Sequence, residues 1–181
     1  MKREFQYPSR DGVTQIHAIE WEPEGEIHAV MQLCHGMVEF IDRYDAFAKY
    51  LNEHGIYVVG HDHLGHGKSV SEGGTFGYFC EQDPATVVVR DVHRLKKITE
   101  EQYPQVPYII LGHSMGSFIA RNYLCRYGSG IGGAVILLTR LPSEAITNEL
   151  ILPELPATGS AGIRRMWTAI SKTNCADLPL P

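Results

Sequence analysis

Ser114 lies in a setting that is typical of a catalytic nucleophile. The apolar segment 108–111 leads directly into the run 112–116, Gly-His-Ser-Met-Gly, and a helical pattern follows. In such a Gly-x-Ser-x-Gly motif the serine occupies a sharp turn between a strand and a helix, and small residues are needed two positions to either side. The motif therefore predicts that Ser114 attacks an acyl group.

A second group of interest follows the apolar segment 29–33, where residues 34–39 read Cys-His-Gly-Met-Val-Glu. A turn here could direct a backbone N–H towards the space above Ser114. Acyl transfer through a serine needs two such donors about 3 Å from the developing negative oxygen. We expect the amides of Met37 and Met115 to be these donors. The simpler alternative is a plain turn with a hydrogen-bonded histidine.

The segment 60–69, Gly-His-Asp-His-Leu-Gly-His-Gly-Lys-Ser, permits two other interpretations. Its three histidines have the spacing of the His-x-His-x-Asp-His zinc signature of the metallo-β-lactamase family, but Gly65 stands where the aspartate belongs. Its end mimics a phosphate-binding loop, but Asp62 stands where that loop needs a glycine. We therefore predict no metal site here, and we expect a loop that turns on Gly65 and Gly67 beside the active site.

Alternating strands and helices must position these groups. A turn signal at 9–12 predicts an antiparallel opening pair, 4–8 with 14–21. The order of the later elements predicts an α/β fold with a mostly parallel sheet and helices on both faces. Ligands of such sheets bind at the carboxyl ends of the strands, where the groups described above fall. The expected buried strands are 29–33, 56–59, 108–111 and 134–138, and the expected helices are 44–54, 84–102 and 117–127.

Composition limits the classes of protein that this chain can represent. Its 181 residues are 44% hydrophobic and 20% charged, which indicates one soluble globular domain. A formal net charge of -5 offers no basic surface for nucleic acid and suits small neutral or apolar substrates better. Because the start lacks a signal-peptide pattern and no segment approaches a membrane span, we expect a cytoplasmic protein without stable membrane insertion. The four widely spaced cysteines are interpreted as free thiols.

Three ordered motifs together resemble one known family. They are His35-Gly36-Met37, the loop Asp-x-x-Gly-His-Gly-x-Ser at 62–69, and the serine motif at 112–116. In this combination the chain resembles the monoacylglycerol lipase and lysophospholipase group of α/β-hydrolases, also labelled serine aminopeptidase S33-like. The resemblance covers about the first 138 residues.

The resemblance implies an α/β-hydrolase fold and a serine hydrolase that cleaves carboxylic esters of medium or long acyl chains, without a metal or organic cofactor. It makes Ser114 the nucleophile and assigns the oxyanion-hole amides to Met37 and Met115. His113 would line the substrate pocket rather than act as the base. We place His35 and Gly36 in the same substrate-binding site.

The chain departs from the family pattern after Leu138. In the family, strands that carry a catalytic aspartate and then a histidine follow, with a helical cap inserted before them, but no histidine follows Ser114 here. We therefore divide the chain into a hydrolase core, 1–138, and a divergent tail or partial cap, 139–181. A truncated or frame-shifted product without the C-terminal strands is favoured over a genuine shortened cap, and within the tail only 163–172 has a helical pattern.

The missing base leaves two hypotheses of different class. In the fold that the resemblance implies, His35 follows the strand next to that of Ser114 and is the one histidine near enough to replace the base. The first hypothesis is a serine ester hydrolase that is impaired because the triad aspartate and histidine are absent. The second is a non-catalytic remnant that binds acyl ligands or a partner, with self-association through an exposed sheet edge. Lipase, lysophospholipase and peptidase activities stay open.

Overall fold

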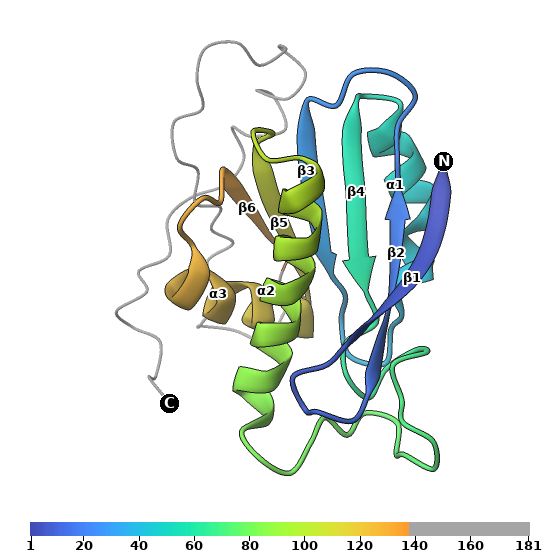
Figure 1. Ribbon diagram of the computed structural model, residues 1–181, viewed down its shortest axis with the longest axis vertical. Coiled ribbons are helices and arrows are strands. Elements are labelled where there is room, and N and C mark those ends of the chain that lie inside the picture. The colour runs from blue at the N-terminus through green and yellow to red at the C-terminus, as the bar shows by residue number, and fades with distance from the viewer. Residues whose placement is uncertain (138–181) are drawn as a thin grey trace, which may run out of the picture.

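The predicted strands form one six-stranded sheet in the computed structural model, which describes residues 1–137 (Figure 1). Helices lie on both faces of this sheet, as the order of elements predicts. The strands are β1 (Lys2–Pro8), β2 (Gln15–Trp21), β3 (Ala29–Cys34), β4 (Ile56–His61), β5 (Tyr108–His113) and β6 (Gly133–Leu137). The helices are the short 3-10 helix η1 (Ile41–Tyr44) and the α-helices α1 (Asp45–Asn52), α2 (Pro84–Gln102) and α3 (Met115–Tyr127).

The strand order reverses direction at one point of the sheet. The order is β1-β2-β4-β3-β5-β6, in which β1 and β2 pair antiparallel, β2 and β4 pair antiparallel, and the other neighbours are parallel. After β3 the chain adds β4 on one side, and it then crosses to add β5 on the other side. The loops after β3 and β5 therefore leave the sheet in different directions, and ligands of open α/β sheets bind at such a point.

Burial on both faces explains why the central strands are nearly continuous apolar runs. Figure 1 shows α2 and α3 packed on one face of the sheet and α1 on the other. Along β3 the side chains alternate between the two resulting cores, with Val30 facing α2 and α3 and Met31 facing α1. Gln32 is buried on the same face as Val30, and its polar groups are satisfied. Its side-chain N–H donates to the Val92 carbonyl, and its side-chain oxygen accepts from the Tyr108 hydroxyl.

The element boundaries differ from the predictions by a few residues at most. The helix 84–102 has the predicted bounds, whereas the predicted helix 44–54 is shortened to α1 and is preceded by η1. Strand β5 extends to His113 because this polar residue still pairs with Leu137 of β6. Residue 138, the tail 139–181 and its predicted helix 163–172 lie outside the described residues.

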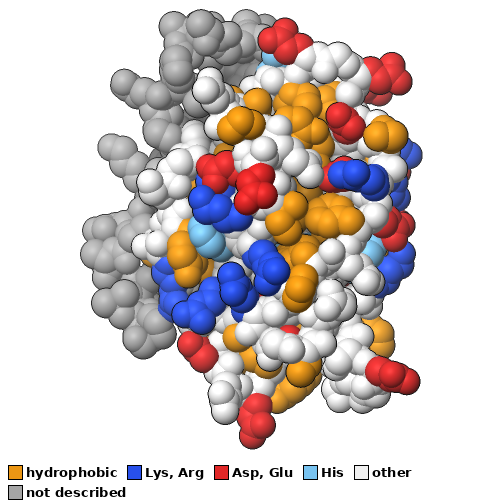
Figure 2. All heavy atoms as spheres, in the orientation of Figure 1, with side chains coloured by type: hydrophobic (Ala, Val, Ile, Leu, Met, Phe, Trp, Pro, Cys, Tyr) orange, Lys and Arg blue, Asp and Glu red, His pale blue; other side chains and the backbone are white. Residues whose placement is uncertain are grey.

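Charged side chains of both signs are interspersed on the face that carries α2 (Figure 2). The basic residues Arg90, Arg94 and Lys97 lie along this helix, and Lys97 pairs with Glu100. None of the helices within residues 1–137 is long and apolar enough to cross a membrane.

Candidate active site

Ser114 occupies the predicted sharp turn between a strand and a helix. It directly follows β5 and precedes α3, with backbone angles φ 52° and ψ -118°. A positive φ is uncommon for a residue with a Cβ, and strained conformations of this kind cluster at functional sites. The surrounding structure must therefore hold Ser114 in place.

Two glycines create the space that this turn needs. A Cβ on Gly112 would lie under 3.0 Å from the backbone of Gly116, and a Cβ on Gly116 would lie under 3.0 Å from the carbonyls of Cys34 and His35. The first turn of α3 thus packs backbone against backbone on the loop after β3. These contacts explain why the motif requires small residues at both positions.

The loop after β3 forms a tight turn over residues 36–39, which we call the oxyanion turn. The Glu39 amide donates to the Gly36 carbonyl at 3.3 Å, and Val38 has φ 59°. A Cβ on Gly36 would lie 3.1 Å from the Cβ of Ser114, so the turn lies directly beside the serine. Met37 and Met115 follow Gly36 and Ser114 in the chain, which brings the two predicted donor residues to the same edge of the sheet.

Val38 strains the oxyanion turn, and Val38→Gly is expected to raise the free energy of unfolding by about 1 kcal/mol. A β-branched residue at positive φ carries roughly 1–3 kcal/mol of strain, part of which is offset by the greater chain entropy of glycine. Val38 is 88% exposed, so the substitution removes little packing. Urea unfolding measures the change, with Val13→Gly as the control, because Val13 is also largely exposed, at 80%, but has no positive φ. Equal changes in both variants would contradict the strain.

His35 is fully buried, and both of its ring nitrogens are engaged. Its Nδ1–H donates to the Gly36 carbonyl at 2.7 Å, and its Nε2 accepts from the His63 amide at 2.9 Å. Burial lowers the pKa of His35 to about 4. The ring therefore has no nitrogen available to take a proton from Ser114 and lines no surface that a substrate can reach. It connects the loops after β3 and β4, and only its backbone approaches the site.

The other histidines of this region form a buried cluster behind His35. The Nε2 of His61 and the Nδ1 of His63 are 3.2 Å apart, and the Nδ1–H of His66 donates to the Leu64 carbonyl. Burial lowers the pKa of His61 to about 3 and that of His63 well below its ordinary value. Within residues 1–137 no group of three or more histidine, cysteine or acidic side chains is arranged to hold a metal ion.

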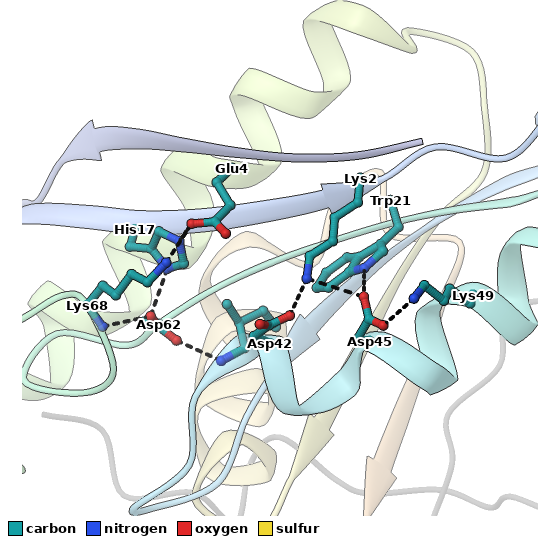
Figure 3. A network of polar contacts seen from close by, with 10 residues as sticks. Lys2, Glu4, His17, Trp21, Asp42, Asp45, Lys49, Asp62 and Lys68 are labelled. Atoms are coloured by element: carbon teal, nitrogen blue, oxygen red, sulfur yellow. Dashed lines mark hydrogen bonds and ion pairs between the residues drawn. The ribbon is translucent and has the colours of Figure 1, made fainter.

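Asp62 and the glycines after it hold the loop beside the site, as we predicted for this segment. Asp62 binds the His17 ring at 2.8 Å and accepts from the Ile41 and Lys68 amides (Figure 3). Gly65 and Gly67 have φ 77° and 50°, so the loop does turn on them. Because Ile41 begins η1, Asp62 also anchors the end of the segment that contains the oxyanion turn. Sequence reasoning used Asp62 as a mismatch to a phosphate-binding loop and as part of a family motif, and it missed this anchoring role.

His113 points towards the oxyanion turn rather than towards open solvent. Its Nδ1 lies 3.2 Å from the Glu39 carboxylate, and its side chain is 29% exposed. The ring therefore links the sharp turn at Ser114, which we call the elbow, to the loop after β3. Sequence reasoning missed Glu39, although its spacing of three residues from Gly36 is that of a capping box, in which a glutamate reaches back to an amide.

A family model described as Hydrolase_4, serine aminopeptidase S33, matches residues 25–145, which is more than half of the chain. The chain belongs to this family of α/β-hydrolases. The predicted family and the predicted fold are both confirmed, and the strand order with the serine after β5 is the part of the fold that the described residues supply.

Its relatives include lipases and esterases. The chain is 31% identical over 138 residues to a monoglyceride lipase of Rattus norvegicus, a match that covers 75% of this chain and 44% of the relative. A monoacylglycerol lipase of Mycolicibacterium smegmatis is 32% identical over 126 residues, 70% of this chain and 42% of that protein. A solved carboxyl esterase of Bacillus coagulans is 35% identical with a TM-score of 0.70, covering 74% of this chain and 43% of that one. The chain thus spans less than half the length of these relatives.

Proposed function

We propose that this chain carries the nucleophile of a serine hydrolase that cleaves carboxylic esters of acyl lipids, of the monoacylglycerol or lysophospholipid type. The observation that carries the proposal is the strained Ser114 on its turn, with the oxyanion turn in contact beside it. The names of the relatives, monoglyceride lipase and carboxyl esterase, support an ester substrate.

In the proposed reaction the Ser114 hydroxyl oxygen attacks the carbonyl carbon of the ester. The negative charge that develops on the carbonyl oxygen is stabilised by the amides of Met37 and Met115, and collapse of this tetrahedral species releases the alcohol and leaves an acyl group on Ser114. Water then hydrolyses the acyl-enzyme. The oxyanion turn and the turn at Ser114 must both keep their positions for the two amides to converge on one oxygen.

The proposed reaction also needs a base for the serine proton, and the histidines nearest to Ser114 are engaged elsewhere. His35 uses both nitrogens within the fold, and His113 faces Glu39. The 181 residues contain no histidine after Ser114. We therefore propose that the chain by itself reacts slowly, and the same observation favours a second candidate function, non-catalytic binding of acyl ligands.

Labelling with a fluorophosphonate probe, read by intact mass, tests the proposal. We expect slow, stoichiometric modification that disappears in Ser114→Ala and persists in a control variant of the exposed Ser71, Ser71→Ala. Slow reaction is expected because an oxyanion hole without a complete triad retains roughly a thousandfold rate enhancement over water. Rapid labelling would support the nucleophile and contradict the impairment. No labelling of folded protein, with saturable binding of a fluorescent fatty acid, would contradict the hydrolase and support the second candidate.

A further inference from the structure

The carboxylate of Glu39 gathers four polar groups from three parts of the site. Its Oε2 accepts from the Gly36 amide at 2.7 Å and from the Tyr44 hydroxyl at 2.8 Å, and it lies 3.2 Å from the His113 ring. Its Oε1 pairs with Arg43 at 3.2 Å. The side chain is 9% exposed, so these contacts replace most of its water. Glu39 therefore connects the oxyanion turn, η1 and the elbow.

The contact to Gly36 controls the peptide units that matter for an oxyanion hole. The Glu39 side chain accepts from the Gly36 amide while the Glu39 amide donates to the Gly36 carbonyl, a reciprocal pair like that of a capping box. Between these bonds lie Met37, the proposed donor, and the strained Val38. A strained turn keeps its shape only when neighbouring contacts enforce it, and Glu39 supplies those contacts.

The charge on Glu39 strengthens this arrangement. Burial by itself would raise the pKa of Glu39, but the hydrogen bonds from Gly36, Tyr44 and His113 outweigh burial and lower it. The group is therefore a carboxylate at neutral pH. Hydrogen bonds to a charged acceptor are roughly twice as strong as neutral ones, so the turn is held more firmly than a neutral acceptor would hold it.

We propose that Glu39 is a positioning residue that holds the oxyanion turn at a fixed place beside Ser114. This inference rests on the proposed hydrolase function, in which the Met37 amide receives the oxyanion. Glu39 does not touch the reacting atoms. It acts through the Gly36 peptide on one side and through His113 of the elbow on the other.

Kinetics of fluorophosphonate labelling test the proposal with a closely matched control. Glu20 of β2 is also buried and also binds one tyrosine, Tyr57, and one arginine, Arg3, but β4 and β3 separate it from β5. Glu39→Ala is expected to lower the maximal labelling rate about 100-fold with little change in probe affinity, because a misplacement near 1 Å has that effect. Glu20→Ala should leave the rate unchanged. Glu39→Gln should recover most of the rate, since its amide oxygen can still accept from Gly36.

Equal rate losses in the Glu39→Ala and Glu20→Ala variants, or no loss in either, would overturn the proposal. A second readout separates it from the hydrolase function itself, namely hydrogen exchange of the Gly36 and Met37 amides followed by NMR. Faster exchange of the Gly36 amide in Glu39→Ala, but not in Glu20→Ala, supports the positioning role even if the unmodified chain does not label. Unchanged Gly36 exchange would refute that role, whereas failure of the unmodified chain to label would refute only the hydrolase.

Discussion

Gly116→Ala is expected to destabilise the protein by about 3 kcal/mol or more, although alanine normally stabilises a helix by up to about 1 kcal/mol relative to glycine. Gly116 lies in the first turn of α3, and its φ is not positive. The reason for the opposite sign is steric. An added Cβ would overlap the Cys34 and His35 carbonyls, and backbone atoms cannot rotate away as a side chain can. The helix or the loop after β3 must move.

Gly132→Ala is the matched control for Gly116→Ala. Its added Cβ would first meet the Tyr108 carbonyl at 3.5 Å, an ordinary contact, and its φ is not positive either. Urea unfolding should therefore show a large loss for Gly116→Ala and a change within about 0.5 kcal/mol for Gly132→Ala. A stabilised Gly116→Ala variant would mean that the helix and the loop are not in the close contact described here.

The features that sequence analysis predicts well are those that depend on local residue types. The elbow follows from two glycines at fixed spacing around Ser114, and the parallel strands follow from apolar runs between helical patterns. The predicted relation between neighbouring strands is also correct. The strand that precedes His35, β3, is predicted to lie beside the strand of Ser114, and β3 does lie between β4 and β5. The elbow and the strands need only the period of the chain and general rules for parallel sheets, whereas the relation between neighbouring strands comes from the fold that the resemblance implies.

The features that sequence analysis misses depend on where a side chain points. The strand order correctly places His35 next to β5, but it says nothing of the ring, which is turned inward onto Gly36 and His63. Asp62 is bound by His17, which is 45 positions away. Such contacts have no local period, so a single sequence contains no pattern that reveals them.

Acidification is expected to destabilise the protein strongly. The free energy of unfolding should fall steeply as the pH drops below about 6.5, the ordinary pKa of histidine. Burial lowers the pKa of His35 to about 4 and that of His61 to about 3, and it lowers that of His63 further. Below 6.5 the unfolded chain therefore binds more protons than the folded one. Stability that is fully present above this pH is lost on acidification, by up to about 1.4 kcal/mol per pH unit for each such histidine.

Two other groups oppose this loss. The hydrogen bond that the His17 ring donates to Asp62 raises the pKa of His17, so protonated His17 adds stability below 6.5 that is lost as the pH rises through its raised pKa. Burial raises the pKa of Asp91 to about 6, so protonation of Asp91 also favours the folded state as the pH falls. The three buried histidines outnumber these two groups, so the net effect of acid is a loss of stability. The rings of the three histidines are in contact, so a proton on one ring disfavours a proton on the next.

Urea unfolding between about pH 7 and pH 5 measures the slope, and His61→Phe isolates one contributor. This variant should be less dependent on pH by up to about 1.4 kcal/mol per pH unit, because one buried group no longer titrates. Val13→Phe is the control, since it places the same side chain at an exposed position and removes no titratable group, so it should leave the slope unchanged. Because Nε2 of His35 accepts from the His63 amide, a proton on this nitrogen removes that bond, so acid should also loosen the contact between the loops after β3 and β4. A slope equal in all three proteins would show that the buried histidines accept protons without cost, and would contradict the role of their burial.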